Sequence, residues 1–184
     1  MNYSITTKKG DQGKTTLLDH SVIEKSDLRP ESYGALDEAT AFIGLARSFC
    51  SQQNVIDILR GMQNHIYLIN AELACPVDRL HLLKHMLQES HLEQLEGWEK
   101  QIEQDLELPR KFVLYGECKS AAYLDVARAV MRRAERRTVI LHHSTDLQNE
   151  TILPYLNRAS DILFLLARYE EFKQNIPYAH PDVV

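Results

Sequence analysis

Apolar residues recur at steps of three and four along most of the chain after Pro30. In residues 31–49 the recurring positions are Leu36, Ala39, Phe42, Ile43 and Ala46. Side chains with this spacing share one face of a helix, so the segment is predicted to be an amphipathic helix with one buried face.

The same period predicts four further helices, at residues 55–74, 91–106, 120–142 and 151–173. Pro76 and Pro109 follow the second and third predicted helices, and proline stops helix propagation. Pro154 falls in the first turn of the last helix, where proline is tolerated. A short helix or turn is expected at residues 81–87.

Two segments lack the helical period. Residues 112–116 are a short apolar run closed by glycine, which favours an extended loop over a lone strand. Residues 1–30 are polar and glycine-containing, and they predict a flexible arm. We therefore expect an all-α fold: a single domain over residues 1–184, with the arm (1–30) preceding a five-helix bundle (31–176).

The composition excludes several classes of protein. The 184 residues are 44% hydrophobic and carry a formal net charge of −5, which argues against a generally basic nucleic-acid-binding protein. No run of about 18 apolar residues is present, so no membrane span is expected. The three widely spaced cysteines suggest no disulfide framework, and a cytoplasmic location is expected.

The segment of residues 7–16 is the first candidate for chemistry. Its two glycines allow consecutive backbone N–H groups to be exposed, its lysines add positive charge, and its threonines add hydroxyl groups. This combination suits a polyphosphate. The segment is not a Walker A loop, because Lys8 stands where that loop requires a glycine. A solvated, lysine-rich terminus without a ligand is the alternative.

The second candidate is a charged face on the helix predicted at residues 120–142. Asp125, Arg128, Arg132 and Glu135 follow one another at steps of three and four, which places them on one side of the helix. Such a face is often only a solvated surface with salt bridges. Alternatively, Arg128 and Arg132 line a cleft and hold an anion, because guanidinium groups bind phosphate through two parallel hydrogen bonds.

The third candidate lies on the last helix. Asn157, Asp161 and Arg168 interrupt an otherwise apolar segment, and buried polar groups need partners. Asp37 or Glu38 on the first helix could supply such a partner, and we expect Asp37 to form a buried pair with an arginine. The alternative is that these residues only pair between helices and have no ligand.

Histidines give no comparable signal. His81 and His85 could share a helix face, but no third ligand accompanies them. The protein itself is therefore expected to provide no dedicated metal site.

Four segments, taken in order, resemble the signatures of one family, the PduO-type ATP:cob(I)alamin adenosyltransferases. They are residues 7–15, 25–38, 127–136 and 156–168, in which the matching letters include Gly10-Asp11, Tyr33-Gly34, Arg132-Arg133 and Asn157-Arg158. Any one of these segments is a weak signal, whereas four in the right order cover most of the chain.

The resemblance implies a function and an assembly. Members of this family transfer the 5′-deoxyadenosyl group of ATP to the cobalt of cob(I)alamin, which gives adenosylcobalamin and triphosphate. The fold would be a five-helix bundle assembled as a homotrimer, with active sites between neighbouring subunits. A Mg²⁺ ion shared with the phosphate oxygens would assist, and such an ion needs few protein ligands.

The resemblance also implies residue roles. Asp37 would pair with Arg128 across the subunit interface, and Arg128, Arg132, Asn157 and Asp37 would form the catalytic set. Phe112 would pack near the corrin ring and exclude water. ATP would be bound by Thr7, Lys8, Gly10, Asp11, Gly13, Thr15, Lys25, Arg128, Arg132 and Asn157.

Two segments depart from the family pattern. Residues 115–120 replace a Pro-Gly-Gly-Ser/Thr turn, and Lys9 and Lys14 replace residues that are usually small or polar. These departures motivate a second hypothesis, a non-catalytic member that binds ATP or corrinoid as a carrier or sensor. A third hypothesis is a helical interaction module with no nucleotide site.

Overall fold

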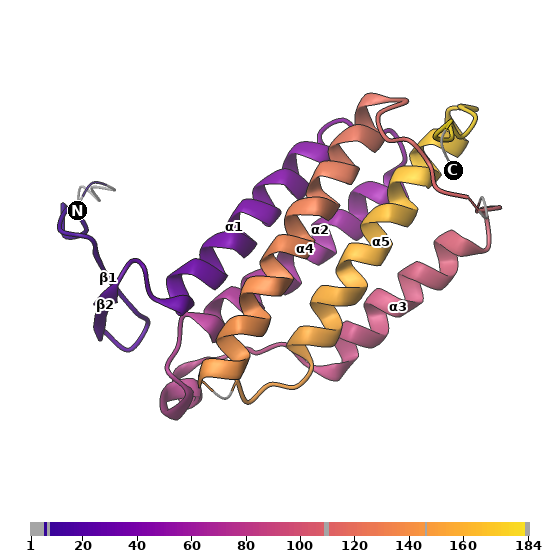
Figure 1. Cartoon of the computed structure of the whole chain (residues 1–184). Helices are drawn as coiled ribbons and strands as arrows, with labels where there is room; N and C mark the ends of the chain where they lie inside the picture. The colour runs from indigo at the N-terminus through magenta and orange to yellow at the C-terminus, as the bar shows by residue number, and fades with distance from the viewer. Residues whose placement is uncertain (1–5, 7, 109–110, 146, 183–184) are drawn as a thin grey trace.

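The computed structural model describes residue 6 and residues 8–108, 111–145 and 147–182. Long helices lie side by side through these residues and form an elongated bundle (Figure 1). They are α1 (Leu28–Arg47), α2 (Gln53–Leu73), α3 (Glu89–Glu103), α4 (Lys119–Thr145) and α5 (Ile152–Lys173). The predicted helical bundle is confirmed, and no observed helix end differs from its predicted position by more than three residues.

The longest helix, α4, lies at the centre of the packing. The contacts of α4 with α1 and with α5 are the two most extensive helix–helix contacts in the described structure. Helix α3 packs against α5. Ion pairs fix the antiparallel register of α1 and α4, because Glu31 meets Arg137 at 3.1 Å and Glu38 meets Arg133. Residues early in α4 therefore lie beside the end of α1.

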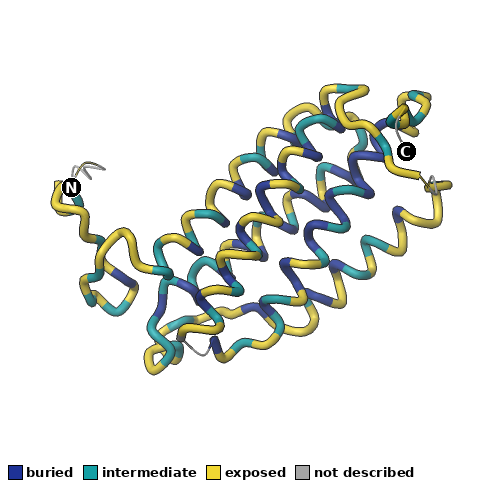
Figure 2. The backbone as a smooth tube through the Cα atoms, viewed as in Figure 1, coloured by how far each residue is buried: buried dark blue, intermediate teal, exposed yellow. Residues whose placement is uncertain are grey.

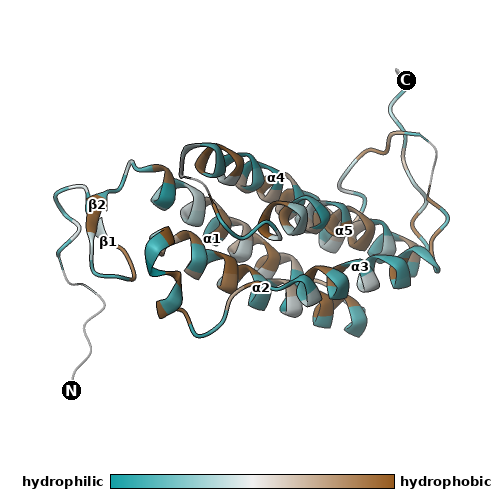
Figure 3. Cartoon of the chain, turned by 90° about the horizontal axis from the view of Figure 1, so that it is seen from below, coloured by the Kyte–Doolittle hydropathy of each residue, from teal (hydrophilic) through white to brown (hydrophobic). Residues whose placement is uncertain are grey.

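The core forms where the apolar faces of the helices meet. Leu36, Ile43, Met62 and Leu124 have no solvent-accessible surface, and Figure 2 shows buried positions recurring along the inner faces of the helices. Apolar and polar faces alternate around the same helices in the hydropathy view (Figure 3). Burial of these faces supplies the main driving force for folding. No helix in the described part of the chain is long and apolar enough to cross a bilayer.

The N-terminal arm contains a small hairpin that the sequence did not predict. Strands β1 (Lys14–Thr16) and β2 (Val22–Glu24) pair antiparallel, with Thr15 opposite Ile23. The hairpin projects beyond the start of α1 at one end of the bundle (Figure 1). Three-residue strands are too short to show an alternating pattern, which is why only an irregular arm was expected.

Backbone contacts attach the hairpin to the end of α2. The N–H of Leu18 donates to the carbonyl of Ala74 at 3.2 Å, and Leu17 is only 6% exposed. Arg29, in the first turn of α1, donates through Nη1 to the carbonyls of Leu73 and Cys75, both at 3.0 Å. These bonds fix the direction in which the hairpin leaves the bundle.

The connections match the predicted organisation in part. A 3₁₀ helix, η1 (Val77–Leu82), begins earlier than the short helix or turn expected at residues 81–87. Residues 112–116 contain neither helix nor strand, which confirms the expected loop. The C-terminal tail packs on this loop, because the N–H of Leu114 donates to the carbonyl of Ala179 at 2.8 Å.

Close packing of α2 on α3 depends on Gly61. A Cβ atom at this position would lie 2.4 Å from Cη2 of Trp98. Gly97, on α3, has open space around the same position. Gly97 therefore serves as the control for Gly61, because both are helical glycines and only Gly61 lacks room for a Cβ atom.

We predict that Gly61→Ala destabilises the fold by about 1–2 kcal/mol, because overpacking outweighs the gain in helix propensity. Gly97→Ala should stabilise it by roughly 0.5–1 kcal/mol. Urea unfolding of both variants measures the two effects. Stabilisation by both substitutions would contradict the packing described.

A buried histidine connects α2 to α3 and α5. His65 is 7% exposed, lies 3.0 Å through Nδ1 from the hydroxyl of Tyr155, and stacks on Trp98 with ring centroids 5.8 Å apart. Burial, aided by the nearby His91, lowers the pKa of His65 from 6.5 to about 4. The folded protein therefore favours the neutral ring.

The unfolded chain then binds more protons at this site than the folded chain between pH 6.5 and pH 4. The stability that the neutral ring contributes is complete above pH 6.5 and is lost as the pH falls toward 4. We predict that the free energy of unfolding drops by roughly 3 kcal/mol more over this range than in a His65→Gln variant. Denaturant titrations at several pH values test this, and equal pH dependence of the two proteins would contradict it.

Candidate functional site

A polar pocket opens between α3, α4 and α5. It encloses about 260 Å³. Arg128 and Arg132 of α4 both line it, while Asp125 and Glu135 of the same predicted face do not. The remaining lining residues are Glu99, Glu103, Ser160, Asp161, Phe164 and Leu165. We call this the arginine pocket.

Arg128 is held at the pocket by two neighbours. Its Nε lies 3.5 Å from Oδ1 of Asp125, and its side chain is 20% exposed. The ring of Tyr115 lies against the guanidinium, 5.0 Å from ring centroid to Cζ. Nε makes no hydrogen bond within the described part of the chain, so these neighbours orient the arginine but leave this donor without an acceptor.

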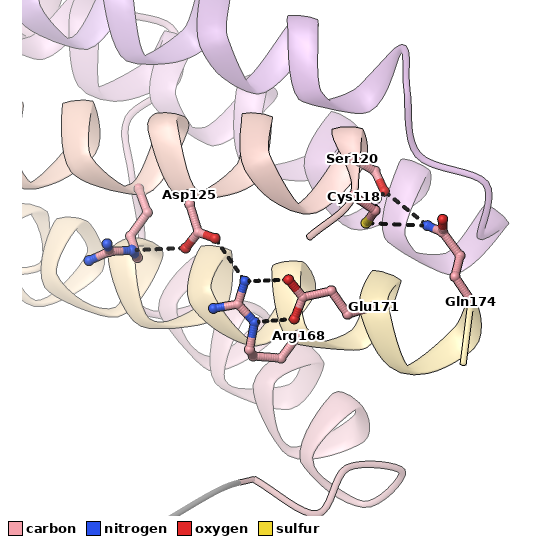
Figure 4. A network of polar contacts seen from close by, with 7 residues as sticks. Cys118, Ser120, Asp125, Arg168, Glu171 and Gln174 are labelled. Atoms are coloured by element: carbon pink, nitrogen blue, oxygen red, sulfur yellow. Dashed lines mark hydrogen bonds and ion pairs between the residues drawn. The ribbon is translucent and has the colours of Figure 1, made fainter. Parts of the chain in front are cut away.

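Behind Arg128 lies a buried network centred on Arg168, which has no accessible surface (Figure 4). Arg168 donates to Oδ2 of Asp125 at 2.8 Å and to both carboxylate oxygens of Glu171 at 2.7 and 3.0 Å. Burial raises the pKa of Asp125, and the Arg168 guanidinium opposes that shift. With Arg128 included, two guanidinium groups face two carboxylates, so the buried charges balance.

The expected buried pair between Asp37 and an arginine of the same chain is wrong. Asp37 is exposed on α1, because the inward positions of that helix are taken by Leu36 and Ala39. The buried partner of Arg168 is Asp125. The expectation that Arg168 finds a partner on another helix is thus confirmed with a different carboxylate.

A second polar cluster joins the end of α5 to the start of α4. Gln174 donates through Nε2 to the hydroxyl of Ser120 at 3.2 Å and approaches the sulfur of Cys118 at 3.6 Å (Figure 4). These contacts fix the point at which the chain enters α4, just after the loop that contains Phe112 and Tyr115.

Asn157 and Asp161 lie one turn apart on α5, toward the pocket's other side. Asp161 lines the arginine pocket and lies 3.3 Å from Nη1 of Arg158. Asn157 is exposed and donates through Nδ2 to Oε1 of Glu135 at 3.3 Å. Glu135 is one turn beyond Arg132 on α4, so Asn157 extends the polar surface next to the pocket.

A second pocket lies on the hairpin. It encloses about 480 Å³ and is lined by Lys9, Gly10, Lys14, Thr15, Thr16, Val22 and Lys25. Three ammonium groups and two hydroxyl groups thus meet around one hollow, a set of groups suited to phosphate oxygens. We call this the lysine pocket.

The turn before β1 shapes the lysine pocket. Gly10 leaves room for Lys25, because a Cβ atom at position 10 would lie 3.0 Å from Nζ of that lysine. Gly13 has a φ of +77°, which favours glycine, and its carbonyl accepts from the N–H of Lys25 at 2.7 Å. Lys8 has a φ of +58°. Gly10 therefore has a steric role and Gly13 a conformational one.

The structure places the predicted ATP-binding residues in two groups. Gly10, Thr15 and Lys25 line the lysine pocket, while Lys8, Asp11 and Gly13 lie in the turn that leads to it. Thr7 lies outside the described residues. Lys9, Lys14 and Thr16 belong to the segment of residues 7–16 that was predicted to suit a polyphosphate, although the family resemblance gave them no individual role.

One chain does not bring the two pockets together. The hairpin lies beyond the start of α1, the end at which Glu31 pairs with Arg137. Arg128 lies about 14 Å further along α4 than Arg137, at 1.5 Å of rise per residue, and therefore toward the opposite end of the bundle. The two pockets share no lining residue within one chain.

Phe112 lies at that opposite end. Its side chain is 74% exposed, and its carbonyl accepts from Nδ1 of His180 at 2.8 Å. Leu114 and Tyr115, on the same loop, are 47% and 55% exposed. The loop therefore presents an apolar surface next to the arginine pocket, to which Tyr115 connects it.

The described residues contain no cluster of three or more histidine, cysteine or acidic side chains that could hold a metal ion by themselves. The acidic side chains that line the arginine pocket are Glu99, Glu103 and Asp161. A Mg²⁺ ion commonly takes most of its ligands from phosphate and water and one or two from carboxylates. The residues present suit that mode of binding.

Comparison with known proteins gives a consistent result. Residues 5–170 match the family described as cobalamin adenosyltransferase. A corrinoid adenosyltransferase from Citrobacter freundii is 35% identical over 170 residues, which cover 92% of this chain and 96% of that protein. One from Mycobacterium tuberculosis (strain H37Rv) is 38% identical over 172 residues, covering 89% of this chain and 86% of that protein.

Solved structures agree with the sequence matches. A phenylalanine-to-alanine variant of a PduO-type ATP:corrinoid adenosyltransferase from Lactobacillus reuteri, complexed with cobalamin and ATP, has a TM-score of 0.91 and 30% identity. The match covers 97% of this chain and 99% of that one. An arginine-to-lysine variant of a PduO-type enzyme from the same organism, complexed with ATP, has a TM-score of 0.87 and 30% identity and covers 96% and 99% of the two chains. The resemblance seen in the four sequence segments is therefore confirmed, and the chain belongs to the cobalamin adenosyltransferase family.

Proposed function

We propose that this protein transfers the 5′-deoxyadenosyl group of ATP to the cobalt of a reduced corrinoid, cob(I)alamin, and releases triphosphate. The observation that carries the proposal is the meeting of Arg128 and Arg132 in one pocket beside the exposed Phe112 loop. This arrangement occurs in a fold that matches, at a TM-score of 0.91, a structure complexed with cobalamin and ATP.

The reaction needs positioning more than acid–base chemistry. An electron pair of Co(I) forms the Co–C5′ bond, the C5′–O5′ bond breaks, and its electron pair leaves with triphosphate. Cobalt is formally oxidised by two electrons, and no proton has to be removed from the nucleophile. The protein must align C5′ with cobalt and neutralise the leaving triphosphate.

The charges of the two pockets divide this task. Arg128 and Arg132 face three carboxylates in the arginine pocket, namely Glu99, Glu103 and Asp161, so the carboxylates outnumber the guanidinium groups and this pocket alone has no excess positive charge. The lysine pocket contributes three ammonium groups, one of which, on Lys14, lies 3.6 Å from a carboxylate oxygen of Glu24. Triphosphate is therefore neutralised best when both pockets contact the same nucleotide.

We place the active site between two subunits of a homotrimer for this reason. The hairpin of one subunit would cover ATP that Arg128, Arg132 and Asn157 of its neighbour contact. Asp37 is exposed on α1 and would pair with Arg128 of the neighbouring subunit. A closed ring of three identical contacts is a symmetrical assembly that satisfies this geometry.

Phe112 would form the apolar wall on the corrinoid side. Its exposed ring is available to pack against the corrin and to exclude water, which competes as a cobalt ligand. Mg²⁺ would be held by the phosphate oxygens and would add positive charge where the leaving group develops negative charge. We expect the enzyme to work in the cytoplasm.

Replacing Arg128 by alanine should lower the rate of adenosylcobalamin formation by about 10²–10³-fold, because a charge that stabilises the leaving group is lost. Formation of the Co–C bond from ATP and chemically reduced cobalamin is followed by absorbance. Arg60→Ala is the matched control, because Arg60 is exposed on α2 and should leave the rate unchanged. Equal rates for Arg128→Ala and the unmodified protein would contradict the proposal.

The same assay separates catalysis from simple binding. If the unmodified protein binds ATP tightly and forms no adenosylcobalamin, the carrier or sensor hypothesis replaces the enzyme. If instead the protein does not bind ATP, and ATP does not protect the hairpin from protease, the interaction module without a nucleotide site remains.

The intersubunit site predicts complementation between two inactive variants. One variant carries Arg128→Ala, and the other carries Lys9→Ala, Lys14→Ala and Lys25→Ala in its hairpin. Random co-assembly at equal amounts should restore activity to about a quarter of the unmodified level, because a site is intact when each half comes from the appropriate variant. Activity no greater than that of the separate variants would show that each site lies within one chain.

A further inference from the structure

Tyr115 occupies a place in the structure that the proposed reaction does not yet explain. Its ring lies 5.0 Å from Cζ of Arg128 and 5.7 Å from Cζ of Arg168. Tyr115 is also where this chain departs from the Pro-Gly-Gly-Ser/Thr turn of its family. The contact between the ring and the two arginines is thus a feature of this chain's own sequence.

One of the two arginines is a fixed support. Arg168 has no accessible surface, is held by Asp125 and Glu171, and lies 5.1 Å from the centroid of Phe164. The Arg168 guanidinium thus contacts two aromatic rings, that of Phe164 at 5.1 Å and that of Tyr115 at 5.7 Å. Because this group cannot move without breaking the buried network, it determines where the Tyr115 ring rests.

The other arginine is held far less firmly. The described contacts of the Arg128 head group are the carboxylate of Asp125 at 3.5 Å and the face of Tyr115. Asp125 is mainly engaged by Arg168, at 2.8 Å. The aromatic face is therefore a principal restraint on the direction in which the Arg128 guanidinium points.

The backbone connects Tyr115 to the corrinoid side. Gly116 follows it with a φ of +108°, a conformation that lets the chain turn away into α4. Before Tyr115 in the chain, the carbonyl of Phe112 accepts from His180, and the N–H of Leu114 donates to the carbonyl of Ala179 in the C-terminal tail. The loop, the tail and Arg128 thus form one connected unit at the end of the bundle opposite the hairpin (Figure 1).

We infer that Tyr115 is a positioning residue that orients Arg128 toward the triphosphate and anchors the Phe112 loop to the ATP-binding helix. It touches neither ATP nor corrinoid in this account and acts through Arg128 and Phe112. The inference rests on the proposed function, because the anion that Arg128 meets is the triphosphate of ATP. The inference adds a coupling between the two substrates, because the same tyrosine ring supports Arg128 on the ATP side and the Phe112 loop on the corrinoid side.

Two substitutions separate the aromatic face from mere bulk. Tyr115→Leu keeps an apolar side chain and removes the π face, whereas Tyr115→Phe keeps the ring and removes only the hydroxyl. Isothermal titration of the full-length protein with MgATP, without corrinoid, measures the affinity for ATP. Steady-state kinetics give kcat and the KM for cob(I)alamin. Tyr115→Leu should weaken ATP binding by about threefold to tenfold and raise the KM for cob(I)alamin, and Tyr115→Phe should restore both.

A second pair of proteins, Arg128→Ala with and without Tyr115→Leu, tests whether the ring acts through Arg128. In an Arg128→Ala background, Tyr115→Leu should have little further effect on ATP affinity, because the group that it positions is absent. An additional loss of the same size in that background would show that Tyr115 acts elsewhere. Thermal unfolding of each variant identifies any loss that comes from a disturbed loop and not from the missing ring.

The outcomes distinguish the two claims. If the unmodified protein is active and Tyr115→Leu binds ATP as tightly as it does, the positioning role is overturned and the proposed function stands. If Tyr115→Phe is as weak as Tyr115→Leu, the hydroxyl and not the aromatic face matters, which also overturns the inference. If the unmodified protein neither binds ATP nor forms adenosylcobalamin, both claims fall.

Discussion

The charge of a leaving triphosphate is the constraint on which the rest of this structure depends. Several negative charges must be met by cations that are fixed in position before the reaction, because side chains that reorganise during the reaction lose much of their stabilising effect. The protein holds these cations in two ways. Lysines gather on a short hairpin, and arginines are fixed on a helix in the middle of a rigid bundle.

The buried network around Arg168 explains how the rigid half is built. A buried guanidinium needs hydrogen-bond acceptors, and Asp125 and Glu171 accept from Nε and Nη2 of Arg168, whereas its Nη1 has no hydrogen-bond partner within the described residues. Asp125 also faces Arg128, so the network that joins α4 to α5 orients the arginine at the pocket. In the proposed function, stability and substrate binding therefore share the same carboxylate, and the hairpin lies at the other end of the bundle.

The sequence predicted the parts of this structure that depend on local periodicity. Five helices and the shared face of Arg128 and Arg132 follow from steps of three and four residues. The hairpin was not predicted, because strands of three residues leave no pattern. Asp125 was not predicted as the partner of Arg168, since the register between two helices sets that pairing and a single sequence does not reveal it. Tyr115 was visible as a departure, but its contact with Arg128 depends on how the loop folds back on α4.

The central claim is that triphosphate lies between lysines of one subunit and arginines of the next. A crystal structure of this protein with MgATP bound tests it most directly. The account predicts phosphate oxygens within hydrogen-bond distance of Lys14 or Lys25 from one subunit and of Arg128 from its neighbour. Nucleotide bound within a single chain, or away from both pockets, would contradict it.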